Sequence, residues 1–170
     1  NPPVKLPGPI LTSEKPWEAF SIGWSCVIDD DGLYKLWYSA SDHDQWAGGR
    51  WHLCYATSED GRHWEKPELG LVEYDGSKRN NIVLPACKLA YIFIDPNGGE
   101  AERYKMVEQV RGSGIRVGSS PDGLVWNLPD ELVCTLKPDT PKQVYWDERI
   151  GRYVAWLKLM VTDDGKPMFP

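Results

Sequence analysis

The sequence predicts an all-β fold built from four-stranded antiparallel blades of the β-propeller type. Three observations support this prediction: a hairpin plan occurs three times, a turn motif occurs twice, and nine Trp and eight Tyr stand against three Phe. Trp and Tyr suit both sheets and sugar sites, because each combines a flat apolar face with a polar edge. The one stretch with weak helical bias, residues 14–20, is interrupted by Pro16, so we expect no helix.

The three hairpins share one plan, which is a β-rich run, a Gly-containing turn and a second β-rich run. Such a pattern is typical of paired antiparallel strands. The tyrosines at equivalent positions are Tyr34, Tyr104 and Tyr153. The paired runs are residues 24–29 with 33–40, residues 89–95 with 103–110, and residues 142–147 with 152–160.

The first two hairpins continue alike, each into a third strand followed by the motif Ser-x-Asp-Gly-x-x-Trp at residues 58–64 and 120–126. In each motif the Asp can accept backbone N–H bonds and the Gly permits a positive φ. The Trp can pack the next strand against the blade. We therefore interpret Asp60 and Asp122 as structural turn residues.

A fourth strand after each motif would complete a blade. The candidates are residues 71–74 or 81–84 in the first blade, and residues 131–135 in the second. The predicted division is an N-terminal segment (1–23), a first blade (24–86), a second blade (87–136) and the start of a third (137–170). Propellers close with ~4–8 blades, so two and a half blades cannot close alone. We expect either further C-terminal blades or an oligomer that completes the ring.

The composition limits the classes of partner. The net charge is −6 and the basic residues are scattered, which disfavours nucleic acid and anionic membranes. No apolar run approaches the ~20 residues of a membrane span. The four cysteines form no CxxC pair, so we expect free thiols and no zinc, with a disulfide still open if the protein is exported. No cofactor is expected, and the compartment stays open. Because the sequence starts at Asn1, we expect that the chain was processed, trimmed or cut from something larger.

Four segments of the sequence resemble a known family. The segments GLYKLWYSAS (32–41), CYATSEDGRHWEKPELGLVEYDGSKRNN (54–81), RYKMV (103–107) and VYWDERIGRYVAW (144–156) resemble the five-bladed β-propeller glycosidase superfamily. That superfamily includes β-fructosidases, levansucrases and α-L-arabinanases, and the likeness is greatest to uncharacterised bacterial glycosyl hydrolase-like members. It extends over roughly residues 15–160. The resemblance implies a five-bladed ring and three carboxylates around its axial funnel.

Glycoside cleavage needs one acid to protonate the leaving oxygen and one carboxylate opposite it. The Trp-x-Asn-Asp-Pro-Asn-Gly motif of β-fructosidases is absent, since the equivalent residues 22–25 contain no carboxylate. The remaining candidates for catalysis are Asp139, which precedes the third hairpin, Asp95, which follows the first strand of the second blade, and Glu18. Asp139 is the preferred one, and structural roles stay open for all three.

The segment from 41 to 51 is polar, Gly-rich and aromatic, as a sugar-binding loop would be. In this interpretation Trp46 or Trp51 stacks on a pyranose ring, while Asp42 and His43 bind hydroxyl groups. Trp17, beside Glu18, is a further predicted sugar contact. Asp42, His43 and Asp44 could also hold a metal, but no second ligand cluster accompanies them, so none is expected.

Three functions remain open. The first is a glycoside hydrolase that uses paired carboxylates on an oligosaccharide, a polysaccharide or a small glycoside. The second is a non-catalytic propeller that binds carbohydrate or protein. The third is a sialidase-like propeller, which would need an arginine triad; Arg103, Arg111 and Arg116 lie in one predicted blade and fit that requirement poorly.

Overall fold

The computed structural model of the chain describes residues 5, 7–44, 50–88, 90–110, 113–136, 138 and 142–159. Within these residues, strands dominate and the helical elements are short 3₁₀ turns, η1 (Pro16–Glu18) and η3 (Glu100–Glu102). The all-β prediction is confirmed. The stretch with weak helical bias forms only the single turn η1, which begins at Pro16.

The first sheet has four antiparallel strands in the order β1-β2-β3-β4. Of the two candidates for its fourth strand, the second one forms β4. The strands are β1 (Ser21–Asp30), β2 (Leu33–Ser41), β3 (Trp51–Ser58) and β4 (Ile82–Pro85). This is the strand order that the sequence predicts for a blade.

The second sheet and the third hairpin are smaller. The second sheet pairs β5 (Ala90–Ile94), β6 (Tyr104–Val110) and β7 (Gly114–Ser120). At the place of its predicted fourth strand, Cys134 forms an isolated antiparallel bridge with Ile115. The third hairpin pairs β8 (Lys142–Asp147) with β9 (Arg152–Leu157). Sheets of four, three and two strands are compatible with two blades and the start of a third, while closure of a ring stays a prediction.

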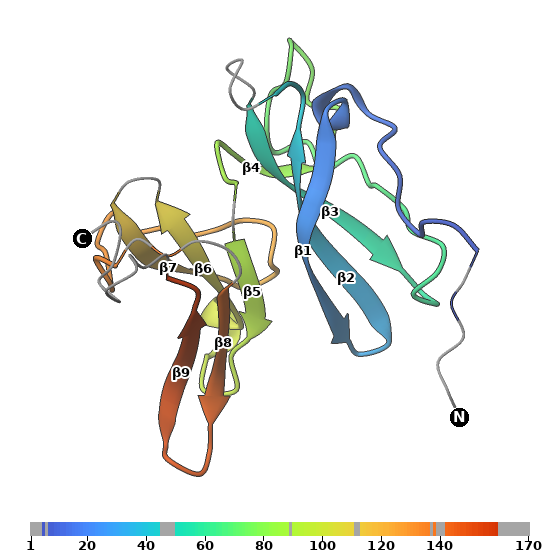
Figure 1. Cartoon of the computed structure of the whole chain (residues 1–170). Coiled ribbons are helices and arrows are strands. Elements are labelled where there is room, and N and C mark those ends of the chain that lie inside the picture. The colour runs from blue at the N-terminus through green and yellow to red at the C-terminus, as the bar shows by residue number, and fades with distance from the viewer. Residues whose placement is uncertain are drawn as a thin grey trace.

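The sheets follow one another in chain order (Figure 1). The first strand of each sheet contacts the first strand of the next, β1 with β5 and β5 with β8. Hydrogen bonds also join neighbouring sheets at the end where β1, β5 and β8 begin. Ser39, opposite the start of β1, donates to the carbonyl of Lys88 just before β5, and Gln109 donates to the carbonyl of Pro138 before β8. We call this the strand-start end, and the opposite end, with the turns after β1, β5 and β8, the turn end.

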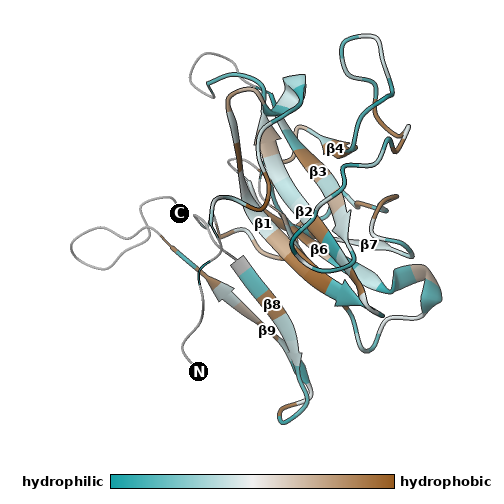
Figure 2. Cartoon of the chain, turned by 90° about the vertical axis from the view of Figure 1, so that its right-hand side faces the viewer, coloured by the Kyte–Doolittle hydropathy of each residue, from teal (hydrophilic) through white to brown (hydrophobic). Residues whose placement is uncertain are grey.

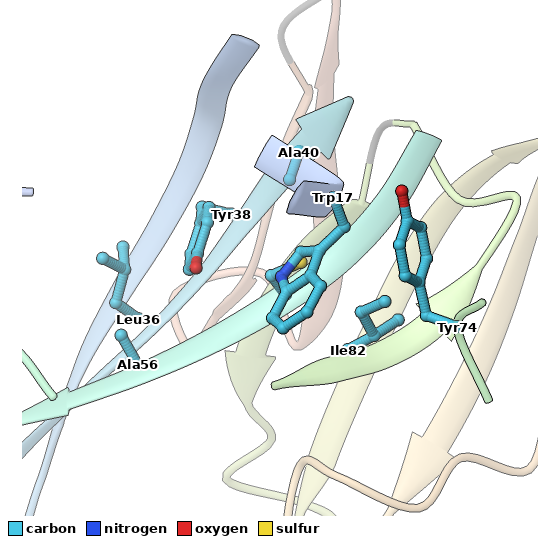
Figure 3. Packing of buried hydrophobic residues seen from close by; sticks show 8 residues of the cluster. Trp17, Leu36, Tyr38, Ala40, Ala56, Tyr74 and Ile82 are labelled. Carbon is cyan, nitrogen blue, oxygen red and sulfur yellow. The ribbon is translucent and has the colours of Figure 1, made fainter. Parts of the chain in front are cut away.

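Hydrophobic side chains pack on both faces of the first sheet and beyond the second. Hydrophobic and hydrophilic residues are interspersed along the strands, as the hydropathy colouring of the ribbon shows (Figure 2). One core packs Trp17, Tyr38 and Tyr74 against the face of the first sheet that lies away from the second (Figure 3). Another core lies between the first two sheets and contains Trp37 and Tyr104. A third joins the second sheet to β8 through Val107, Ile115 and Val144. On β9 of the third hairpin, Trp156 is 65% exposed.

The two copies of the Ser-x-Asp-Gly-x-x-Trp motif form the same turn. Oδ1 of Asp60 accepts hydrogen bonds from the backbone of Arg62 and His63, each at 2.8 Å. Oδ1 of Asp122 likewise accepts from Leu124 and Val125 at 2.8 and 3.0 Å. The glycines have φ of +70° at Gly61 and +79° at Gly123. Both aspartates are thus occupied by backbone groups, as the sequence interpretation requires.

The second of these turns also joins the two sheets. Trp37, 1% exposed, donates its indole N–H to the carbonyl of Gly123 at 2.8 Å. A Cβ at Gly123 would lie 2.5 Å from the Trp37 ring, whereas a Cβ at Gly61 would meet only the Tyr34 ring, at 3.8 Å. Glycine is therefore required at position 123 for two reasons: its positive φ and the close approach of the two sheets.

Gly123→Ala should destabilise the protein more than Gly61→Ala, although the two backbones are alike. A side chain at positive φ costs about 1–2 kcal/mol at either position. At Gly123 the overpacked Trp37 adds about 1–3 kcal/mol. The measurement is urea unfolding of both variants beside the wild type. Equal losses of unfolding free energy would show that the close approach of Trp37 does not constrain the fold.

A second contact between the first two sheets lies at the turn end, where Asp30 accepts hydrogen bonds and ion pairs from donors in both sheets. Lys35 lies 2.6 Å from Oδ2, the Arg103 guanidinium donates to both carboxylate oxygens, and the Tyr104 hydroxyl donates to Oδ2. These donors, with Arg103 the strongest, hold the pKa of Asp30 well below its usual range although burial opposes them. Only 8% of the Asp30 side chain is exposed, so the ion pairs are partly shielded from water.

Asp30→Ala should cost about 3 kcal/mol of unfolding free energy, because it leaves shielded cations without their anion. The exposed neighbour Asp31, at φ +55°, supplies the control, and Asp31→Asn should change stability by less than about 0.5 kcal/mol. Because the folded pKa of Asp30 is depressed, its contribution is complete above the unfolded value of about 3.9 and declines as pH falls below it. Urea unfolding from pH 7 to pH 3 measures this. A difference between Asp30→Ala and the wild type that stays constant down to pH 3 would contradict the role of the charge.

Candidate functional site

The start of β3 places two different groups of side chains on the two faces of the first sheet. Successive residues of a strand point to opposite faces. Trp51 is accordingly on the face toward the second sheet, with Leu53 of the shared core, while His52 packs against Tyr74 on the other face. Both residues lie at the strand-start end, beside the end of β2 and the end of β4.

On the His52 face, Asp42 is the centre of a polar cluster. Its side chain is 2% exposed and accepts from the Arg50 guanidinium at 2.7 Å, the Arg50 backbone at 2.9 Å and Tyr74 Oη at 3.1 Å. His43 lies 3.2 Å away, with 73% of its side chain exposed. Burial would raise the pKa of Asp42, but the Arg50 donors outweigh it and hold that pKa below its usual range. Asp42 is thus an ionised anchor for Arg50, and His43 is the exposed member of the predicted sugar-binding pair.

His52 completes this cluster as a neutral group. It is 5% exposed, its ring packs edge-on against Tyr74 at 5.5 Å, and burial lowers its pKa. Neither ring nitrogen has a hydrogen-bond partner among the residues that the structure describes. A buried polar group without a partner costs free energy, so His52 is an unsatisfied polar position next to Asp42.

On the Trp51 face, three side chains from three segments meet. The rings of Trp24 and Trp51 have centroids 5.1 Å apart and planes tilted by 53°. The ammonium of Lys88 lies over both, 5.1 Å from the Trp24 ring and 4.8 Å from the Trp51 ring. Trp24 is 43% exposed, and its φ of +41° coincides with a break in the β1–β2 register between Gly23 and Cys26. Of these three residues, the sequence analysis identified Trp51 only.

Glu18, a predicted catalytic carboxylate, is fully buried in the structure. Its oxygens accept from Tyr38 at 2.6 Å, from Lys66 at 2.8 Å and from the backbone of Glu14 and Lys15 at 2.9 and 3.1 Å. The neighbouring Trp17 is 7% exposed and donates to Asn81 at 2.9 Å. These contacts favour a structural role for both residues; their predicted catalytic and sugar-binding roles stay predictions.

Asp95 lies at the turn end, immediately after β5. Oδ1 accepts from Tyr153 at 2.7 Å and from the backbone of Asn97 at 3.0 Å, and Lys105 lies 4.0 Å from Oδ2. The Tyr153 hydroxyl comes from β9, so Asp95 links the second sheet to the third hairpin. Among the described residues it shares no partner with Glu18, and η1 and the end of β5 lie at opposite ends of the sheets (Figure 1).

The remaining predicted residues, Asp139 and Trp46, lie outside the described residues. Pro138, the residue before Asp139, is buried at the strand-start end, where its carbonyl accepts from Gln109. A carboxylate that the sequence analysis missed, Glu108, lies on the neighbouring strand and pairs with Arg116 at 2.5 Å. Its place within a hydrophobic strand was the available signal, since buried carboxylates are uncommon.

A hollow of about 360 Å³ lies at the other end of the first sheet. Part of its lining belongs to the first of the repeated turns, where Asp60 accepts from backbone donors and lies 2.6 Å from His63. The lining residues are Leu33, Thr57, Ser58, Glu59, Asp60, His63 and Glu65. No cluster of three potential metal ligands occurs in the described part of the chain. None of the helices described there is long and apolar enough to cross a membrane.

Comparisons with known proteins place the fold among glycoside-active proteins. A glycosyl hydrolase from Bacteroides ovatus superposes with a TM-score of 0.59 and 16% identity, over 92% of this chain and 46% of the other. A second solved structure superposes with a TM-score of 0.52 and 16% identity, over 90% of this chain and 52% of the other. It comes from a study of the GH130 family of mannoside phosphorylases, which contains glycoside hydrolases that target β-1,2-mannosidic linkages in Candida mannan. At this identity the likeness concerns the fold alone.

Two uncharacterized Mycobacterium tuberculosis proteins, from different strains, are 30% and 29% identical over 143 residues, or 80% of this chain. The chain spans 42% of the length of each. No family model matches the chain.

Lys66→Met should cost about 3–5 kcal/mol of unfolding free energy, because it leaves the Glu18 carboxylate buried without its cation. Arg79→Met removes the corresponding charge from an exposed pair with Glu68, and should cost less than about 1 kcal/mol. Urea unfolding of both variants at pH 7 tests this. If Lys66→Met is as stable as the wild type, Glu18 is not held by this ion pair and a structural role for it loses its main support.

Proposed function

We propose that the chain is part of a carbohydrate-active protein that cleaves glycosidic bonds at the strand-start end of its sheets. The observation that carries this proposal is the fold likeness over at least nine-tenths of the chain to two structures of glycoside-active proteins. The site supports it with an exposed tryptophan, a second tryptophan and a lysine at one end of the sheets. Aromatic faces and nearby polar groups are what a sugar ring needs.

In this proposal Asp139 is the first catalytic carboxylate to test, since its neighbour Pro138 lies at the strand-start end. Asp95 and Glu18 stay alternative predictions for the second carboxylate, although both have structural partners. The chemistry would be transfer of the glycosyl group to water, or to phosphate, given that one fold neighbour is described with mannoside phosphorylases. β-1,2-Linked mannosides are therefore the first substrates to assay.

A non-catalytic carbohydrate-binding propeller is the second candidate. It is favoured by the saturation of Glu18 and Asp95 with internal donors, because a carboxylate held in this way is not available for proton transfer. A sialidase-like function has less support. Arg103 binds Asp30 at the turn end and Arg116 pairs with Glu108, so these two arginines do not converge on one ligand.

The proposal is tested by assaying the full-length protein with β-1,2-mannobiose and aryl β-mannosides, with and without inorganic phosphate. Asp139→Asn should lower kcat by about 100-fold or more, the range for loss of a general acid or base. Asp31→Asn, an exposed carboxylate at the turn end, should leave kcat unchanged. Full activity in Asp139→Asn would remove Asp139 from the mechanism. Absence of turnover together with sugar binding would favour the non-catalytic candidate.

A further inference from the structure

Trp24 has a backbone conformation that a tryptophan rarely adopts. Its φ of +41° belongs to the left-handed region, where a side chain costs about 1–2 kcal/mol relative to the right-handed conformation. The strain accompanies the break in register between Gly23 and Cys26, which turns the side chain out of the regular alternation of β1. Such strain persists where the surrounding structure or a function requires it.

Burial does not explain the conformation, because Trp24 is 43% exposed. The strained backbone brings the indole beside Trp51 of β3, with the ring centroids 5.1 Å apart. An exposed tryptophan that is held by a costly backbone conformation against a second tryptophan forms an ordered aromatic surface. Order matters here, because a pre-organised surface loses little entropy when a ligand stacks on it.

Lys88 adds a polar group to this surface. Its ammonium lies over both indoles, at 5.1 and 4.8 Å from their centroids, and Ser39 fixes its backbone through a hydrogen bond to the Lys88 carbonyl. An ammonium has three donors, which suit sugar hydroxyls. The three side chains come from β1, β3 and the connection from β4 to β5, so they meet where the first two sheets adjoin at the strand-start end.

We propose that Trp24, Trp51 and Lys88 form a pyranose-binding subsite, in which the apolar face of the sugar stacks on Trp24 and Lys88 donates to a hydroxyl. The proposal rests on the carbohydrate-active function proposed above and extends it by assigning the sugar-contacting residues. The backbone strain at Trp24 is then retained for ligand binding. The subsite lies at the opposite end of the first sheet from the hollow at Asp60.

Trp24→Gly is the informative variant, because glycine accepts positive φ without cost and removes the ring. Binding of β-1,2-mannobiose and of cellobiose to the full-length protein is measured by isothermal titration calorimetry and by saturation-transfer NMR. Trp24→Gly should weaken binding about tenfold or more, while its thermal midpoint stays equal to or above that of the wild type. Lys88→Met, which keeps the aliphatic stem, should weaken binding severalfold.

The matched control is Trp156→Ala, which removes another exposed tryptophan, in β9 of the third hairpin. It should leave sugar affinity unchanged. The subsite is contradicted if wild-type protein binds neither sugar, if Trp24→Gly binds as tightly as the wild type, or if Trp156→Ala weakens binding equally. These results are distinguishable from failure of the proposed function, because loss of turnover in Asp139→Asn and loss of affinity in Trp24→Gly are independent readouts.

Discussion

The contact between the first and second sheets is the constraint on which the rest of the structure depends. Trp37 fills the space between the sheets and donates to the Gly123 carbonyl, and Gly123 leaves no room for a side chain against that ring. The contact is formed by residues 86 positions apart in the chain, so it fixes the relation of two sheets that local hydrogen bonding leaves independent. The same contact brings the connection before β5 beside the starts of β1 and β3.

The two ends of the sheets have different physical characters. Carboxylates are satisfied from within at both ends, and at the turn end two of them link neighbouring sheets: Asp30 pairs with Arg103, and Asp95 accepts from Tyr153. At the strand-start end, an exposed strained tryptophan and a buried histidine without a described partner lie on opposite faces of one sheet. Satisfied pairs stabilise a structure and unsatisfied or strained groups lower its stability. The strand-start end is therefore the better candidate for function.

The sequence predicted the elements that local chemistry determines. β-Rich runs on either side of Gly-containing turns predicted the hairpins, and the repeated motif predicted that Asp60 and Asp122 bind backbone N–H groups, which the structure confirms. The candidate site was harder to predict from the sequence, because the burial of Glu18 depends on Lys66, 48 residues away, and no local pattern indicates that pairing. The left-handed conformation of Trp24 depends on a register break between two strands, which the residue sequence of β1 alone does not reveal.

The most direct test of the account is a crystal structure of the full-length protein soaked with β-1,2-mannobiose. The account predicts a sugar ring at the strand-start end, stacked on Trp24 and within hydrogen-bond distance of Lys88. Sugar bound instead in the hollow lined by Thr57, Asp60 and His63 at the turn end would contradict it. Such a result would show that the acidic turn of the first blade carries the recognition that we assign to the aromatic pair.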